Sequence, residues 1–177
     1  KGDNFNGNKF AEKALALGAS FAIVDEQKYK TNNNIFLVNN VLETLQNLAK
    51  HHRKQLKTTI IALTGSNGKT TTKELINAVL SEKFNTTATV GNLNNHIGVP
   101  LTVLSIKPKT EIGIVEMGAN HQKEIEFLCT ICQPDFGYIT NFGKAHLEGF
   151  DGIEGVIKGK SELYTYIKEH NKIAFVN

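Results

Sequence analysis

Residues 60–74, IIALTGSNGKTTTKE, decide how this sequence folds. The apolar run at 60–63 is typical of a short buried strand, and Gly65 and Gly68 then supply the permissive backbone that a tight turn needs. After the turn, apolar residues recur at helical spacing, at Leu75, Ile76, Val79 and Leu80. The stretch therefore predicts a strand, a glycine-bearing turn and a helix.

Such a turn points several backbone N–H groups, at the positive end of a helix, toward one point that suits a polyphosphate. The segment fits a short GxxGKT form of the phosphate loop, with Leu63 standing where the full pattern has its first glycine. Lys69 is expected to reach the outer phosphates, and the Thr70 hydroxyl to contact Mg²⁺. A glycine turn that only caps a helix is the alternative, but the flanking strand and helix favour a bound nucleotide. The residues expected to bind it are Thr64, Gly65, Ser66, Asn67, Gly68, Lys69, Thr70 and Thr71.

The composition limits the class of protein. With 177 residues, 40% of them hydrophobic, the chain can bury a core and hold one or two domains. A net charge of +3 is too small to indicate binding to nucleic acid. No stretch has the length and apolarity of a membrane span, and no signal peptide is visible, so we expect a cytoplasmic protein without membrane contact. The sequence begins with lysine, and residue 1 need not be the true start.

The two cysteines, Cys129 and Cys132, have the C-x-x-C spacing of redox and zinc sites. They share one predicted helix face with Ile125 and Leu128, which favours two reduced cysteines in the core. Zinc would require two further ligands, and the sequence offers none that can be placed nearby.

Strands and helices alternate along the whole chain. The expected strands are 21–24, 35–38, 59–63, 86–90, 112–117 and 136–141. The expected helices are 10–17, 41–54, 69–82, 97–104, 121–132 and 152–168. This alternation favours a parallel sheet covered on both faces, an α/β fold. We predict part of a small α/β domain at residues 1–57 and the first part of a larger parallel-sheet domain at residues 58–177.

In such sheets, ligands bind beyond the carboxyl ends of the strands. Glu116 lies at the end of the strand at 112–117, and His146 follows the strand at 136–141. A carboxylate and an imidazole beside a nucleotide are candidate ligands or orienting groups for Mg²⁺. Alternatively, Glu116 caps the helix expected near Asn120, and His146 is an ordinary loop residue. An acidic residue at a strand end beside a phosphate loop favours the metal for Glu116; for His146 both interpretations stay open.

Lys160 is placed unusually for a lysine. It falls within an apolar stripe of the helix at 152–168, whose members are Ile153, Val156, Ile157, Tyr164 and Ile167. Lys158 and Glu162 point the other way. Either Lys160 extends its ammonium group to water, or it faces the site for a chemical reason.

Several stretches in order resemble the Mur ligases, a family that joins amino acids and peptides to cell-wall precursors. They are Thr64–Glu74, GNLNNHIGVP at 91–100, EMGANHQKEI at 116–125 and AHLEGF at 145–150. EGVIKGKSELY at 154–164 is similar to the family's carbamylated-lysine segment, with Lys160 at the modified position. DNFNGNKF at 3–10 resembles the UDP-binding domain, with Asn6 and Asn8 in place of the more usual Asp and His. The resemblance implies a P-loop-type central domain, present in part.

The combination is most similar to members that add D-alanyl-D-alanine to UDP-N-acetylmuramoyl-tripeptide. The resemblance implies a monomeric, cytoplasmic bacterial ligase of peptidoglycan synthesis that uses ATP and forms ADP through an acyl phosphate. It implies catalytic roles for Lys69, His146 and Lys160, and two Mg²⁺ ions held by Thr70, Glu116 and His146, with carbamylated Lys160 in support. Asn92, Asn94 and Asn95 would face the muramyl-peptide, or would simply form a turn-rich loop.

Three alternatives remain at this stage. A related Mur ligase or a folylpolyglutamate synthase shares the chemistry, although GNLNN and EMGANHQ argue against both. A nucleotide-binding module without ligase chemistry would not need Glu116, His146 and Lys160 together. The chain can also be a fragment that binds nucleotide without turnover, because family members begin earlier and carry a C-terminal domain for the incoming dipeptide.

Overall fold

The structure is a computed structural model that describes residues 5–143 and 147–176. It divides into two compact units, residues 1–45 and 46–177, and the division falls within α2 (Val41–Gln55). The domain boundary expected at 57/58 lies just beyond the end of this helix and stays a prediction. Among the described helices, none is both long enough and apolar enough to cross a membrane.

The first unit is a small α/β element built around two short strands. After η1 (Gly7–Phe10) and α1 (Ala11–Ala16), β1 (Ala22–Val24) pairs in parallel with β2 (Ile35–Leu37), and η2 (Gln27–Tyr29) lies between them in sequence. Its buried apolar residues are Ala11, Val24 and Ile35. Asn8 connects the start of the unit to the residue that follows β1, because its Nδ2 donates to Asp25 Oδ1 over 2.7 Å and its Oδ1 accepts from Asp25 N over 3.0 Å.

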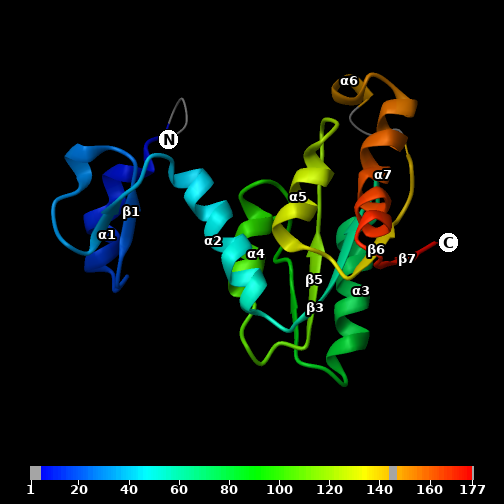
Figure 1. Ribbon diagram of the computed structural model, residues 1–177, viewed down its shortest axis with the longest axis horizontal. Coiled ribbons are helices and arrows are strands. Elements are labelled where there is room, and N and C mark those ends of the chain that lie inside the picture. The colour runs from blue at the N-terminus through cyan, green and yellow to red at the C-terminus, as the bar shows by residue number, and fades with distance from the viewer. Residues whose placement is uncertain (1–4, 144–146, 177) are drawn as a thin grey trace. The chain divides into compact units, whose positions relative to one another are not determined.

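The second unit contains a five-stranded parallel sheet within its described residues, in the order β4-β5-β3-β6-β7 (Figure 1). The strands are β3 (Thr59–Thr64), β4 (Thr86–Ala88), β5 (Ile112–Glu116), β6 (Phe136–Ile139) and β7 (Ile173–Phe175). The helices are α3 (Lys69–Ser81), α4 (Gly98–Ser105), α5 (Glu124–Cys132), α6 (Leu147–Phe150) and α7 (Ile153–Glu169). The predicted parallel α/β fold is confirmed.

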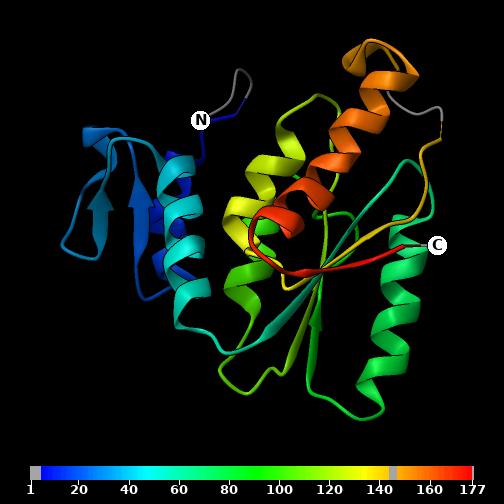
Figure 2. The same ribbon diagram turned by 45° about the vertical axis from the view of Figure 1, so that its right-hand side comes forward.

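The main core lies on one face of this sheet, under α4, α5 and α7. Figure 2 shows these helices on one side of the sheet and α3 on the other. The core contains apolar side chains from the strands, such as Ile60 and Val115, together with Val103, Leu128 and Leu163 from the three helices. Cys129 and Cys132 are both buried and unpaired in it, as the sequence predicts.

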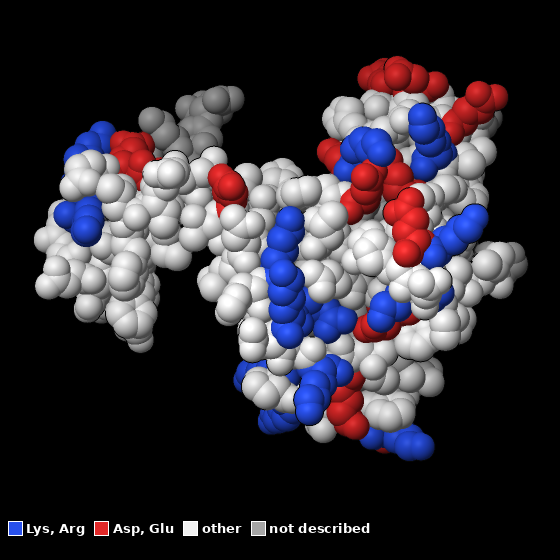
Figure 3. Space-filling model, viewed as in Figure 1, with Lys and Arg blue, Asp and Glu red and all other residues white. Residues whose placement is uncertain are grey.

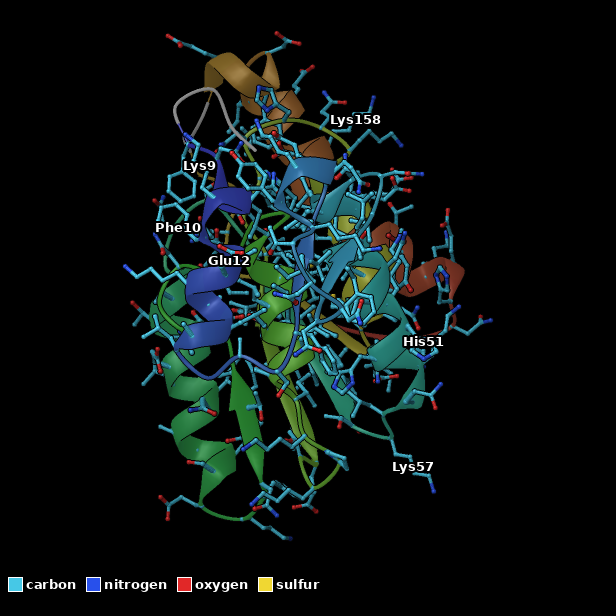
Figure 4. All side chains as sticks on the ribbon, turned by 90° about the vertical axis from the view of Figure 1, so that its left-hand side faces the viewer. Lys9, Phe10, Glu12, His51, Lys57 and Lys158 are labelled. Atoms are coloured by element: carbon cyan, nitrogen blue, oxygen red, sulfur yellow. The ribbon has the colours of Figure 1, made fainter. Side chains whose placement is uncertain are left out.

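Two helices differ from the sequence predictions in which face they bury. The stripe of α3 that carries Leu75 and Val79 lies along an exposed apolar groove rather than in the core. On α7, Ile153 and Ile157 are also exposed, so the predicted stripe is wrong at these two positions. Small residues explain the difference: Gly155 and Gly159 contact Phe150 closely, which turns the glycine-bearing face of α7 inward. Lys158 lies on the outer side of α7 (Figure 4).

Other differences are local. The structure adds α6 and β7, which the sequence patterns did not predict. Helix α5 begins at Glu124 rather than at residue 121, because Lys123 has a left-handed backbone with φ of 71°. On the face seen in Figure 3, acidic and basic side chains are interspersed over the second unit.

Candidate functional site

The candidate site lies where the carboxyl ends of three neighbouring strands meet. β3 lies between β5 and β6, and its last residues, Leu63 and Thr64, are in register with Glu116 and Ile139. The loop at 65–68 follows β3, and the segment at 140–143 follows β6. The parallel sheet therefore brings the predicted phosphate loop beside Glu116, as the sequence predicts.

The glycines of the phosphate loop are required by its geometry. Gly65 has φ of 144°, and a Cβ there would overlap the Thr140 hydroxyl group. Gly68 has φ of 74° and is the N-cap of α3. Both backbones are in regions that an L side chain rarely adopts, so only glycine lets the loop turn from β3 into α3 without strain.

The segment after β6 holds the loop in place. Asn141 accepts from Ser66 N through its backbone oxygen and from Asn67 N through Oδ1, each over 3.1 Å. The Thr140 hydroxyl donates to Asn67 O over 2.7 Å, and the Ser66 hydroxyl donates to Gly143 O over 2.8 Å. The loop is therefore preorganised by side chains whose role the sequence analysis did not predict.

Lys69 lies over the loop that it follows. Its Nζ donates to Gly65 O over 2.9 Å and to Ser66 O over 3.2 Å. Burial lowers the pKa of Lys69, and the Glu116 carboxylate opposes that shift. A cation held here, at the N-terminus of α3, is placed to neutralise the outer phosphates of a bound nucleotide.

Glu116 has the geometry of a cation ligand. Its side chain is buried, and its Oε1 accepts from the Thr70 hydroxyl over 3.3 Å and from Asn94 Nδ2 over 2.8 Å. Its Oε2 is also buried and has no hydrogen-bond partner among the described residues. A buried carboxylate oxygen without a partner is costly unless a ligand satisfies it, and oxygen is the ligand that Mg²⁺ prefers. The Thr70–Glu116 pair therefore fits a magnesium ion.

The alternative in which Glu116 caps the next helix is excluded. The N–H groups at and before the start of α5 have other partners: in the turn before the helix, Glu124 Oε2 accepts from Asn120 N over 2.6 Å and from His121 N over 3.1 Å. Glu162 of α7 accepts from Lys123 N over 2.6 Å and from Glu126 N. These two carboxylates hold the segment between β5 and α5, and Glu116 is left facing the phosphate loop.

The three asparagines of the 92–95 segment have different positions. Asn94 contacts Glu116, and its backbone oxygen accepts from Gly118 N over 2.7 Å. Asn95 Oδ1 accepts from Ile97 N and Gly98 N, which places it at the N-terminus of α4. Asn92 is exposed. Their predicted contacts with substrate stay a prediction, although Asn94 and Asn95 line the adjoining cavity.

A cavity of about 600 Å³ adjoins the loop and the carboxyl end of β5. Its lining residues are Lys69, Asn94, Asn95, His96, Gly118, Ala119, Asn120, Gln122, Lys123, Glu124, Phe127 and Leu128. Most of them are polar, and Phe127 with Leu128 provides an apolar part of the wall. The cavity is large enough for a peptide-sized group next to a nucleotide.

Lys160 is buried near this cavity. Its Nζ donates to Ala119 O over 3.1 Å and lies 5.2 Å from the centre of the Phe150 ring. Burial, followed by repulsion from the charge of Lys69, lowers the pKa of Lys160 to about 8. Of the two interpretations open for Lys160, extension to water is excluded by its burial, and its ammonium group lies at Ala119, which lines the cavity.

Three of the predicted residues have no described side-chain contact that places them at the site. His146 lies outside the described residues, so its metal role stays a prediction. The Thr64 hydroxyl donates to Met117 O over 2.8 Å, and Thr71 is exposed. In the described part of the chain, no group of three or more histidine, cysteine, aspartate or glutamate side chains could hold a metal ion. Burial raises the pKa of Cys132 to about 12, which makes its thiol unreactive.

One buried side chain in the site was missed by the sequence analysis. Lys73 is fully buried on α3, three residues after Thr70, and its Nζ donates to Thr89 O over 2.6 Å. The spacing of three residues, which places it on the same helix face as Thr70, was the available signal.

Comparisons with known proteins agree with this geometry. Residues 63–177 match the Mur ligase middle domain. The chain is 39% identical to the UDP-N-acetylmuramoyl-tripeptide--D-alanyl-D-alanine ligases of Bacillus subtilis (strain 168) and Escherichia coli (strain K12), over 99% and 100% of this chain and 39% of each relative. The MurF ligase from Thermotoga maritima in complex with ADP is similar in structure, with a TM-score of 0.86 and 37% identity over 98% of this chain and 40% of that one.

A MurF crystal structure from Acinetobacter baumannii is also similar, with a TM-score of 0.84 and 38% identity over 94% of this chain and 36% of that one. The chain thus spans about two fifths of the length of the relatives it matches. The match to the middle domain covers more than half of the chain and includes the phosphate loop, Glu116 and Lys160. Sequence, fold and site agree, and the chain belongs to the Mur ligase family.

Proposed function

We propose that the complete protein is an ATP-dependent, ADP-forming ligase that joins D-alanyl-D-alanine to UDP-N-acetylmuramoyl-tripeptide. The observation that carries the chemistry is the buried, unpartnered Oε2 of Glu116 beside Thr70 at the phosphate loop. The substrates are supported by the names of relatives that match nearly all of this chain. We also propose that the protein is a monomer that acts in bacterial cytoplasmic peptidoglycan synthesis.

ATP is proposed to bind along Thr64–Thr71. The N–H groups at the start of α3 face the phosphates, and Lys69 exchanges its loop carbonyl partners for phosphate oxygens. A relative that was solved with ADP supports a nucleotide here. Once the phosphates are bound, the Lys69 charge stabilises the negative charge that spreads over the transferring phosphoryl group.

Thr70 and Glu116 are proposed to hold one Mg²⁺, and His146 a second. Mg²⁺ would supply charge neutralisation between the phosphates of the nucleotide. Asn94 orients Glu116 for this role by donating to Oε1, and Oε2 keeps no hydrogen-bond partner among the described residues. Loop residues preorganised in this way need little rearrangement when the nucleotide binds.

Lys160 is proposed to carry a carbamate that supports the second Mg²⁺. Its lowered pKa gives the neutral amine that attacks the carbon of CO₂, and the product is an N–COO⁻ group with one proton released to solvent. The charge of Lys69 would stabilise this anion, whereas it repels the ammonium form. Carbamylation therefore removes an unfavourable interaction between two lysines.

The proposed reaction has two steps. A carboxylate oxygen of the tripeptide attacks the γ-phosphorus of ATP, and the bond to ADP breaks, which gives an acyl phosphate. The amine of the dipeptide then attacks the acyl carbon, loses a proton and displaces phosphate, which gives the amide. Activation is needed because a carboxylate is a poor electrophile at neutral pH. The cavity beside Lys69, which Asn94 and Asn95 line, is proposed to hold the muramyl-peptide, with Asn92 as a further contact.

For the 177 residues by themselves, we propose nucleotide binding without turnover. The supporting observation is that they span about two fifths of the relatives' length. The amide product formed by this chain alone would contradict the proposal.

The test is a ligation assay with the full-length protein, ATP, Mg²⁺, UDP-N-acetylmuramoyl-tripeptide and D-alanyl-D-alanine, with omission of each component in turn. We expect ADP, phosphate and the amide product only when all are present. Glu116→Gln should abolish most of the product, whereas Glu82→Gln, at the exposed far end of α3, should not. Turnover with a folate and glutamate instead would favour the folylpolyglutamate synthase alternative.

A further inference from the structure

Lys73 is a buried cation that the proposed reaction does not use. Its side chain has no exposed surface, although it ends in a polar amino group. The ammonium donates to Thr89 O over 2.6 Å and to Gly91 O over 3.5 Å, and it lies 2.6 Å from Glu74 Oε1, whose side chain is mostly exposed. Burying a lysine in this way is costly, and an apolar side chain could fill the same space. Packing alone therefore does not explain why a lysine occupies this position.

The contacts of the 89–94 segment connect Lys73 to Glu116. Thr89 accepts from Lys73 through its backbone oxygen, and its hydroxyl oxygen accepts from Glu116 N over 3.0 Å. Five residues later, Asn94 Nδ2 donates to Glu116 Oε1 over 2.8 Å. Both ends of the segment thus contact Glu116, and Lys73 contacts the residues at its beginning.

The same helix completes the arrangement from the other side. Thr70, one turn before Lys73 on α3, donates to the same Oε1 of Glu116 over 3.3 Å. Helix α3 thus makes two contacts: Thr70 contacts the Glu116 carboxylate directly, and Lys73 contacts the segment that contains Asn94. The backbone at Gly91 has φ of 55°, so the segment turns at the point that Lys73 reaches.

We infer that Lys73 is a positioning residue for Glu116: it holds the 89–94 segment against α3 so that Asn94 orients the carboxylate and leaves Oε2 open to a cation. This inference rests on the proposed role of Glu116 as a metal ligand. An ammonium group is suited to this task because it donates to more than one carbonyl at once. Groups that orient a metal ligand affect metal affinity although they do not touch the metal.

The experiment measures Mn²⁺ binding by electron paramagnetic resonance in the full-length protein saturated with a non-hydrolysable ATP analogue. Lys73→Met keeps the length of the side chain and removes the charge and the donors. We expect it to weaken the Mn²⁺ Kd by on the order of tenfold, the size seen for residues that orient metal ligands. Lys172→Met is the matched control, because Lys172 pairs with Asp135 at the ends of the strands that lie away from the phosphate loop. The Mn²⁺ Kd of this variant should not change.

A purely structural role for Lys73 predicts a different result. Lys73→Met would then lower the midpoint of thermal unfolding but leave the Mn²⁺ Kd of the folded protein unchanged, and this outcome would overturn the inference. If Lys73→Met does not fold, Lys73→Gln is measured instead. Its side chain is shorter but keeps an N–H donor, so we expect a smaller loss of Mn²⁺ affinity. Selective ¹⁵N labelling of asparagine adds a readout that needs no metal, because the Asn94 side-chain amide signal should shift in either variant.

Glu116→Gln separates this inference from the proposed function. An unchanged Mn²⁺ Kd in Glu116→Gln would overturn the metal role of Glu116 itself. A weakened Kd in Glu116→Gln together with an unchanged Kd in Lys73→Met would overturn only the positioning role of Lys73. Weakened Kd values in both, with Lys172→Met unchanged, support the inference.

Discussion

The Thr70 hydroxyl donates a hydrogen bond to one oxygen of Glu116, while the other oxygen of this buried carboxylate has no partner in the described part of the chain. The two residues come from α3 and β5, and the sheet brings them together at the phosphate loop. A buried polar atom without a partner costs about 1–3 kcal/mol. The site is therefore formed at the expense of stability before any ligand binds.

Glu116→Gln is expected to leave the protein at least as stable and to make it less active. The neutral amide is less costly to bury, so the free energy of unfolding without ligands should stay equal or rise by about 1 kcal/mol. Addition of Mg²⁺ and nucleotide should raise the thermal midpoint of the unchanged protein more than that of the variant. Differential scanning fluorimetry with and without Mg²⁺ measures both effects. An equal shift in both proteins would contradict the metal site.

Lys69→Ala is expected to weaken nucleotide binding while the fold stays intact. A charge-assisted hydrogen bond contributes about 1.5–3 kcal/mol, so the nucleotide Kd should rise by about 10- to 100-fold. Titration with a fluorescent ATP analogue measures the Kd, and circular dichroism checks the fold. Lys109→Ala, in an exposed loop, is the control and should bind normally. Normal turnover of Lys69→Ala would exclude the phosphate-loop assignment.

The lowered pKa of Lys160 predicts a dependence of stability on pH. Its folded value is about 8, against an ordinary value of 10.5, so the unfolded chain binds more protons between these two values. Stability should therefore rise as pH increases from about 8 toward 10.5, and Lys160→Met should lose this rise. Denaturant titrations in CO₂-free buffer measure it, with Lys158→Met on the outer face of α7 as the control. A rise that persists in Lys160→Met would assign it to another group.

Lys160→Ala is expected to abolish most ligation in the full-length protein. If the carbamate carries the function, a small carboxylic acid added to the buffer should restore part of the activity by occupying the same place. The same acid should not rescue Lys69→Ala, whose lost group is a cation. A full-length structure with Mg²⁺ and nucleotide that shows a plain amine at Lys160 would contradict the proposal.

Asp135→Asn is expected to destabilise the fold without affecting the site. Asp135 Oδ2 accepts from Arg53 Nη2 over 3.0 Å and from Ile60 N over 2.9 Å, and Oδ1 accepts from Lys172 Nζ over 2.7 Å. Burial raises the pKa of Asp135, but hydrogen bonds from Lys172 and Ile60 and the Arg53 charge outweigh it, so the pKa lies below 3.8.

The stabilisation is therefore present above about pH 4 and is lost as pH falls through the lowered value. At pH 7 the variant should lose about 1.5–3 kcal/mol, the contribution of hydrogen bonds to a charged group. Urea unfolding at pH 7 and pH 3 measures the loss, which should be smaller at pH 3. The nucleotide Kd should not change, because these contacts lie at the opposite ends of the strands from the phosphate loop.

The local pattern of the sequence was sufficient for the element order. Each strand and helix of the second unit up to α5 was expected within a few residues of its observed bounds, because apolar periodicity reports which face of an element is buried. Two short elements, α6 and β7, carry too few residues for a period to be read. The exposed Ile153 and Ile157 show the limit of periodicity, since glycines that fit against Phe150, rather than the largest apolar residues, decide which face of α7 turns inward.

By itself, the sequence determined the parallel α/β fold, the phosphate loop with Lys69 and Thr70, and Glu116 as a residue at the end of a strand. Only the tertiary structure decided which atoms meet: Asn94 and Thr70 at one oxygen of Glu116, Lys160 at the carbonyl of Ala119, and Lys73 at the carbonyl of Thr89. The physical reason is that strand and helix patterns depend on neighbours along the chain. The burial of a lysine and the partners of a carboxylate depend on segments 16 to 46 residues apart, which only the packed sheet brings into contact.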